Sequence, residues 1–224
     1  MVSHGLGNLV GVIALSAGAL LKVAEREGLD QQAVLKTTAT IQRTADRMAR
    51  LIADLLDTQA IEAGRLRIDS RPHDVAALVR DEVEALSPLG IEKGIWIEAK
   101  PPSPGTLVPC DPDRFRQVVR NLVGNAIKYS RKGTTVTVKA ELGRDEAAFS
   151  VSDEGPGMPP EQLAHVFDRG FRGKTADAST GHGMGLYISK AIVEAHGGRM
   201  WAESMLSVGS TFHFALPLVP GIRA

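Results

Sequence analysis

Residues 180–198 read TGHGMGLYISKAIVEAHGG, a glycine-rich run that leads straight into an apolar helical pattern. Gly181, Gly183 and Gly185 occupy alternate positions, and the apolar residues that follow recur at helical spacing. Backbone N–H groups at a helix start, together with the positive end of the helix dipole, can receive a phosphate group. The spacing G-x-G-x-G-L matches neither the Rossmann motif G-x-G-x-x-G nor the P-loop, which ends in lysine. The stretch therefore predicts a phosphate-binding turn of another type.

Upstream, the stretch NLVGNAIKYS begins at Asn121 and falls within a predicted helix over residues 111–129. Asn121 and Asn125 are four residues apart and share one helix face, and Lys128 follows about one turn later. Amide oxygens suit Mg²⁺ when phosphate groups already bind it, because this cation prefers oxygen ligands. The pattern indicates a helix face against which a metal-bound phosphate can lie.

Between these two stretches, DEGPGM begins at Asp153, the last residue of a predicted strand. A buried carboxylate there can accept a hydrogen bond from an exocyclic amine, and Gly155 and Gly157 allow the backbone to approach a flat ring closely. The later segment FDRGFRGKTADAST is rich in small and basic residues, a composition typical of a mobile lid. Its residues Arg172 and Lys174 are candidate phosphate contacts.

From about residue 64 the chain alternates short β patterns with amphipathic helical patterns. The predicted strands are RLRID (65–69), GIWIEA (94–99), TTVTVKAEL (134–142), AAFSVSD (147–153), GRMWAES (198–204) and STFHFALPL (210–218). The predicted helices cover residues 75–91, 111–129 and 186–196, with a short helical patch PEQLAHVFD at 160–168. Mostly antiparallel strands with helices between them predict an α+β fold, with the helices on one face of a sheet.

The first 60 residues have a different pattern, in which apolar residues step alternately by four and three over two segments. Gly28 stops the first segment, and Asp30 is placed to cap the second. Two such helices form a hairpin with little core of its own, so pairing of two chains into a four-helix bundle is expected. An intrachain hairpin packed on the rest of the chain is the alternative. We expect two domains, residues 1–63 and 64–224.

The overall composition limits the classes of partner. Twenty-six Lys and Arg balance twenty-six Asp and Glu, so the chain has no basic footprint and we expect no nucleic-acid partner. A single cysteine, Cys110, excludes an internal disulfide and a cysteine metal cluster. No apolar run approaches the roughly 18 residues of a membrane span. These features predict a soluble, cytoplasmic chain, either alone or as part of a larger or membrane-attached sensor.

Taken together and in order, the motifs between residues 111 and 214 resemble the N, G1, F, G2 and G3 boxes of the GHKL ATPase superfamily. The resemblance implies the Bergerat α/β sandwich, with ATP held under a lid and Mg²⁺ coordinated by Asn125. It also implies nucleotide-binding roles for Asn121, Lys128, Tyr129, Asp153 (adenine), Gly155, Gly157, Gly181, Gly183, Gly185, Leu186 and Thr211 (beneath the adenine).

With the helical hairpin and the dipeptide Ser3–His4 upstream, the chain resembles the catalytic core of a bacterial two-component sensor histidine kinase. The hairpin would then be the dimerisation and phosphoacceptor domain of a homodimer. His4 would accept the γ-phosphoryl group of ATP and pass it to an aspartate of a response-regulator receiver domain. If Leu6 and Val10 take the d and a positions of a heptad, His4 falls at an exposed b position beside the seam.

The residues around His4 depart from the H-box of that family, which reads His, acid, Leu, Arg, Thr or Asn, Pro, Leu. Here Gly5 replaces the acid, Gly7 the arginine and Val10 the last leucine, and the proline is absent. The missing acid would help to orient the imidazole and accept its proton, and such help contributes about 10²–10⁴-fold. Two alternatives therefore remain: a nucleotide-binding dimeric scaffold derived from a kinase, and a water-using GHKL-type ATPase.

Overall fold

The computed structural model describes residues 10, 12–20, 31–173 and 183–218. The chain divides into two compact units, Met1–Ala60 and Ile61–Ala224. The domain boundary expected after residue 63 lies just beyond this division. The dimerisation and phosphoacceptor roles expected of the first domain stay predictions, because His4 lies outside the described residues.

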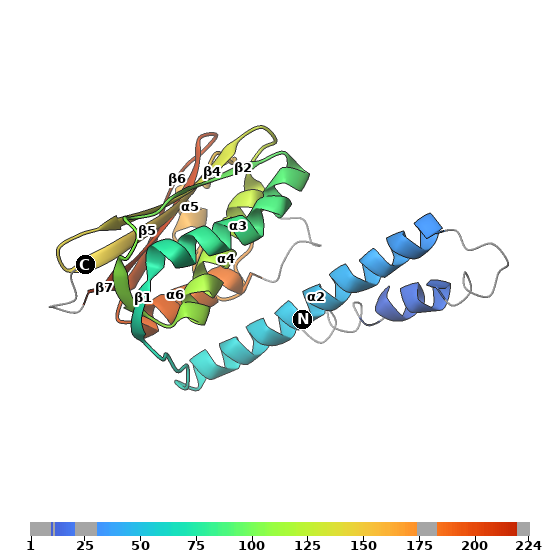
Figure 1. Ribbon diagram of the computed structural model, residues 1–224, viewed down its shortest axis with the longest axis horizontal. Coiled ribbons are helices and arrows are strands. Elements are labelled where there is room, and N and C mark those ends of the chain that lie inside the picture. The colour runs from blue at the N-terminus through green and yellow to red at the C-terminus, as the bar shows by residue number, and fades with distance from the viewer. Residues whose placement is uncertain (1–9, 11, 21–30, 174–182, 219–224) are drawn as a thin grey trace. The chain divides into compact units, whose positions relative to one another are not determined.

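The described part of the first unit is helical, as the heptad pattern predicts. Residues 10 and 12–20 are helical, and a long helix, α2, runs from Gln31 to Glu62 (Figure 1). The expected stop at Gly28 and cap at Asp30 lie outside the described residues. Large apolar side chains are exposed on both helical segments, namely Val10, Val12, Leu15, Leu35, Ile52 and Leu56.

The second unit is built on a five-stranded sheet of order β2-β4-β5-β7-β6. Its strands are β2 (Trp96–Lys100), β4 (Thr135–Leu142), β5 (Glu146–Asp153), β6 (Arg199–Met205) and β7 (Gly209–Pro217). Strand β2 pairs with β4 in parallel, and the other three pairings are antiparallel. A separate antiparallel pair joins β1 (Arg71–Asp74) to β3 (Leu107–Cys110).

Three helices pack on one face of the large sheet: α3 (Val75–Lys93), α4 (Pro112–Tyr129) and α6 (Gly185–Ala195) (Figure 1). The short helix α5 (Pro160–Leu163) precedes the glycine-rich segment. The core between helices and sheet centres on an aromatic cluster. Phe115 of α4 lies edge-on to Phe149 of β5 at 5.0 Å between ring centroids, and Phe149 stacks on Phe214 of β7 at 4.7 Å. The predicted α+β architecture is confirmed.

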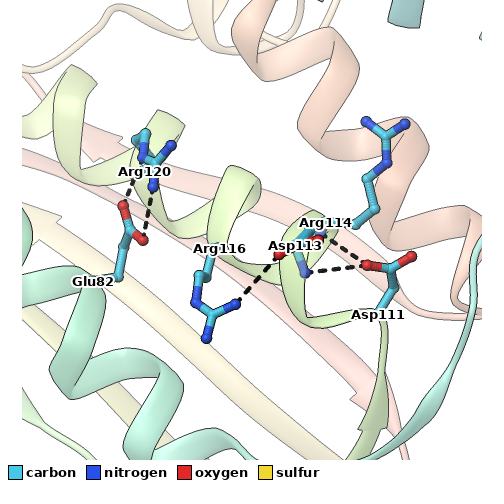
Figure 2. Close-up of polar contacts among 6 residues, drawn as sticks. All are labelled: Glu82, Asp111, Asp113, Arg114, Arg116 and Arg120. Atoms are coloured by element: carbon cyan, nitrogen blue, oxygen red, sulfur yellow. Dashed lines mark hydrogen bonds and ion pairs between the residues drawn. The ribbon is translucent and has the colours of Figure 1, made fainter.

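The beginning of α4 is fixed by its cap and by a histidine. Asp111 Oδ1 accepts from the backbone N–H groups of Asp113 and Arg114, the cap expected of an aspartate at the start of the sequence DPD (Figure 2). The backbone N–H of Asp111 donates to His196 Nε2, just after α6, at 3.0 Å. His196 Nδ1 lies 2.8 Å from Ile192 O, and because a carbonyl only accepts, Nδ1 carries the proton. The start of α4 is thereby tied to the end of α6.

Two local predictions are wrong. Residues 65–69 form no strand, because their backbone pairs with no neighbouring strand. Of their side chains, that of Leu66 packs against the core. The first strand is instead Arg71–Asp74, and its partner β3 escaped prediction because its LVPC sequence is short and contains proline. In the patch at 160–168, only Pro160–Leu163 are α-helical, and turns follow.

An ion pair joins α3 to α4. Arg120 Nε and Nη2 donate to the two carboxylate oxygens of Glu82 at 2.7 and 3.1 Å (Figure 2). The Glu82 side chain is 3% exposed, whereas that of Arg120 is 58% exposed. Removing the arginine therefore leaves a buried carboxylate without its counter-ion, which costs more than the pair itself contributes.

We predict that Arg120→Leu lowers the free energy of unfolding by about 2 kcal/mol, less than for a fully buried pair because Arg120 is half in solvent. The double variant Glu82→Leu/Arg120→Leu should recover most of this loss, because no buried charge remains. Urea unfolding followed by circular dichroism measures both. Equal stabilities of the wild type and the single variant would contradict this account of the pair.

Candidate functional site

Asp153 stands at the end of β5, where its carboxylate organises the loop that follows. Its Oδ1 accepts from the backbone N–H of Gly155 at 2.8 Å and from that of Ser210 at 3.3 Å. Burial raises the pKa of this carboxyl above its usual range, although the two N–H groups act in the opposite direction. Oδ2 has no hydrogen-bond partner among the described residues, so it is the oxygen left for a ligand.

The glycines of this loop permit a close backbone approach. Gly157 has φ +68°, and a Cβ there would lie 2.0 Å from Met205 O. A Cβ at Gly155 would lie 2.8 Å from Tyr129 O, the carbonyl at the end of α4. The loop is also bonded to the β6–β7 hairpin, because the Met158 N–H donates to Ser204 Oγ at 2.8 Å. Asp153, the loop and the end of α4 therefore form one tightly packed cluster.

The structure brings Ser210, rather than Thr211, next to Asp153. Asp153 and Ser210 are register partners between β5 and β7, and Ser210 is buried. Thr211 pairs instead with Ser152, and their hydroxyl oxygens are 3.0 Å apart. Side chains alternate along a strand, so Thr211 lies on the opposite face from Ser210 and the core residue Phe212. Sequence reasoning missed Ser210, although this alternation gives the signal that would have found it.

The polar residues predicted on α4 fall along the side that faces α6 and the loop. The Asn121 amide Nδ2 lies 3.2 Å from Gly185 O and 3.2 Å from Ser189 Oγ, both on α6. Asn125 is half-buried, and its side chain makes no hydrogen bond to another described residue. Lys128 Nζ donates to the Tyr129 hydroxyl at 2.8 Å and lies 4.5 Å from that ring's centroid.

The start of α6 provides backbone N–H groups. Met184 occupies the N-cap position, and a methionine has no side-chain oxygen to accept from the first turn. Gly183 has φ +70°, and a Cβ there would lie 2.5 Å from Phe171 O, so only glycine fits. Gly185 begins the helix, and Leu186 packs against the core. This geometry suits an anion at the helix start.

Of the remaining residues predicted to contact phosphate, only Arg172 is among those that the structure describes. Arg172 is exposed at the end of the described segment before the glycines. Lys174 and Gly181 lie outside the described residues. The described residues thus form two neighbouring groups along α4, one around Asp153, Gly155 and Tyr129, and one around Asn121 and Gly185. Together they present a carboxylate oxygen, amide groups and the start of a helix, which can recognise an amine-bearing ring and an anion.

Comparisons with known proteins agree with this arrangement. Residues 110–220 match the family described as histidine kinase-, DNA gyrase B-, and HSP90-like ATPase. The adaptive-response sensory kinase SasA of Synechococcus sp. (strain JA-3-3Ab) is 32% identical over 220 residues, which cover 97% of this chain and 58% of SasA. SasA of Synechococcus elongatus is 36% identical over 170 residues, 75% of this chain and 44% of that protein. Residues 110–220 are thus a domain of this ATPase family, and 97% of the chain is similar to a sensory histidine kinase.

Solved structures agree with this assignment. Full-length ShkA, solved in complex with AMPPNP, is 28% identical and superposes with a TM-score of 0.73. The match covers 97% of this chain and 44% of the ShkA chain. The Acinetobacter baumannii histidine kinase AdeS shares the fold, with a TM-score of 0.72 and 22% identity over 96% of this chain and 98% of that one. The chain spans about half the length of the two SasA relatives. Its described residues include no helix long and apolar enough to cross a membrane.

Proposed function

We propose that this chain binds ATP with Mg²⁺, transfers the γ-phosphoryl group to His4, and acts as the kinase of a two-component system. The observation that carries the proposal is Asp153, whose Oδ1 is held by two backbone N–H groups while Oδ2 is left to accept from an amine. Adenine carries such an amine, and the glycines at 155 and 157 let the loop pack closely against Tyr129 and Met205, which holds Asp153 in place. The family match over residues 110–220 supports the same ligand.

The residues present also fit the phosphate end of ATP and its cation. The N–H groups at the start of α6 suit phosphate oxygens, and Arg172 would add positive charge. Asn125 has an amide oxygen with no partner among the described residues, a ligand type that suits Mg²⁺ already bound by phosphates. When bound, Mg²⁺ would neutralise charge on the phosphates. Ser210 takes the place beside Asp153 that the sequence predicts for Thr211, and Lys174 and Gly181 stay predictions.

The transfer step is an in-line substitution at phosphorus. A neutral imidazole nitrogen of His4 attacks the γ-phosphorus, the bond to the β,γ-bridging oxygen breaks, and ADP leaves with that electron pair. The imidazole proton passes to solvent or a nearby base. In a second transfer, a receiver-domain carboxylate attacks the same phosphorus and releases the histidine. These steps require His4 in its neutral form, which an unperturbed histidine largely has near neutral pH.

A homodimer through the N-terminal helices is part of the proposal. The support is the set of large apolar side chains exposed on these helices, for example Leu15 (77% exposed) and Leu35 (63%). A second chain would bury this surface in a four-helix bundle. The response-regulator partner, a cytoplasmic location and a sensor module outside this chain follow from the kinase assignment and are proposed with it.

Titration calorimetry with ATP tests the proposal. We expect ATP to bind in the presence of Mg²⁺, to bind more weakly in EDTA, and to bind far more tightly than GTP because the Asp153 carboxylate can only accept. Absence of ATP binding would overturn the proposal. Binding without phosphoryl transfer would instead support the scaffold alternative, to which Gly5 in place of the H-box acid points.

The raised pKa of Asp153 gives a pH dependence. Burial disfavours its charged form, so the carboxyl takes up its proton at a higher pH than an ordinary aspartate does. Protonation removes an acceptor for the adenine amine, and ATP affinity should therefore begin to fall, as the pH is lowered, at a higher pH than with an ordinary aspartate. Protonation of ATP itself also contributes, but it contributes equally in Asp153→Asn. Calorimetry on both proteins isolates the Asp153 component, and identical pH profiles would contradict this prediction.

A further inference from the structure

Helix α4 is held by polar contacts on two different sides. Arg120 reaches Glu82 on α3, and the next residue, Asn121, reaches α6. Consecutive residues project about 100° apart around a helix, so the two contacts oppose rotation of α4 from separate directions. The contact with α6 lies on the side that carries the predicted nucleotide-binding residues, whereas the contact with α3 does not.

On α6, the partner of Asn121 is a buried hydroxyl that no motif singles out. Ser189 is 0% exposed and lies beside Ile188, which is likewise 0% exposed. A hydroxyl in such surroundings costs free energy unless it is hydrogen-bonded, and its Oγ lies 3.2 Å from Asn121 Nδ2. An alanine would fill this small volume without burying a polar group. Packing alone therefore does not account for a serine here.

The chemistry of the partners fixes which way the Asn121 amide faces. Gly185 O lies 3.2 Å from the terminal amide and can only accept, so the NH₂ group must be directed toward α6. Its second hydrogen is then available to Ser189 Oγ. Asn121 Oδ1 is left without a partner among the described residues. The amide oxygen is thus kept off α6 and available to a ligand.

We propose that Ser189 is a positioning residue, which holds the Asn121 amide so that Oδ1 faces the Mg²⁺–phosphate group of the bound nucleotide. This inference rests on the proposed ATP-binding function. Without the Ser189 hydroxyl, one N–H of Asn121 loses its acceptor, and only the contact with Gly185 O restrains the amide, so its orientation is held less tightly. The expected consequence is a loss of affinity that depends on the metal, because the adenine contacts at Asp153 are unchanged.

Ser189→Ala tests this role by calorimetry with ATP in Mg²⁺ and in EDTA. We expect the dissociation constant in Mg²⁺ to rise about five-fold, the worth of one hydrogen bond, with less than about a two-fold change in EDTA. Arg120→Leu is the matched control, because it loosens α4 on the α3 side. It should lower the stability without changing the ratio of the two dissociation constants.

A double-mutant cycle with Asn121→Ala tests whether Ser189 acts through Asn121. Adding Ser189→Ala to Asn121→Ala should cause no further loss, because the group that Ser189 positions is already absent. Additive losses, or an unchanged dissociation constant in Ser189→Ala, would overturn the inference while ATP binding by the wild type stands. If the wild type binds no ATP, the proposed function fails and the inference falls with it.

The side-chain amide signals of Asn121 in the nucleotide-free protein provide a readout that is independent of ATP. In a ¹⁵N-labelled sample, Ser189→Ala should shift the Asn121 Nδ2 protons and speed their exchange with water, whereas Arg120→Leu should leave their exchange rate unchanged because the contact with α6 remains. Unchanged Asn121 signals in Ser189→Ala would count against the hydrogen bond and overturn the inference.

Discussion

Replacing Asp153 with asparagine is expected to weaken ATP binding about 100-fold, the worth of a hydrogen bond to a charged group. The substitution preserves shape, and the asparagine oxygen can still accept from the N–H groups of Gly155 and Ser210. The other terminal atom changes from an acceptor to an NH₂ donor, however, and that donor meets the adenine amine. Binding is therefore lost without loss of the loop structure, as calorimetry and thermal unfolding together should show.

The same substitution should also change base preference. A donor at this position matches the 6-oxo group of inosine triphosphate, whereas the wild-type carboxylate matches the amine of ATP. The ratio of ATP affinity to ITP affinity should fall in Asp153→Asn. Glu154→Gln is the matched control, because Glu154 is exposed and its Oε1, which accepts from the Thr135 N–H, remains. Equal loss of ATP binding in the two variants would show that the loop, and not the Asp153 carboxylate, accounts for binding.

Replacing His4 with glutamine is expected to remove the protein-bound phosphoryl group entirely while ATP affinity stays within about two-fold, because His4 is not among the residues proposed to bind the nucleotide. Glutamine carries no nitrogen that can form a stable phosphoryl bond. The measurement is incorporation of label from γ-labelled ATP after removal of free nucleotide.

The control for that experiment is His73→Gln, which removes a histidine of strand β1 outside the proposed site. It should keep the label. If His4→Gln retained a label of undiminished intensity, another side chain would be the acceptor, and the assignment of His4 would be wrong.

Much of the fold follows from local signals in the sequence. Asp111 caps α4 as the DPD sequence predicts, and the alternating patterns on either side of Gly143 form the β4–β5 hairpin. Residues 65–69 show where this reasoning fails. Their apolar and charged residues alternate as in a strand, but a strand also needs a partner, and pairing is decided by residues far along the chain.

Site residues could be predicted where the backbone conformation requires one residue type. They were harder to predict where a contact between two helices explains the residue. Gly157 and Gly183 have positive φ and no room for a Cβ, which explains glycine at both positions. Ser189 gives no such signal, because a small hydroxyl residue in an apolar helix reads as a neutral filler. Its contact with Asn121 joins residues 68 positions apart and becomes visible only when α4 and α6 are packed.

The fate of the γ-phosphoryl group in the wild-type chain tests the central claim most directly. The chain is mixed with γ-labelled ATP and Mg²⁺, and protein-bound label and free phosphate are measured in the same samples over time. We expect protein-bound label that is labile in acid and stable in base, as for a phosphohistidine, with little free phosphate. Steady release of free phosphate with no protein-bound label would contradict the account and identify the chain as a water-using ATPase.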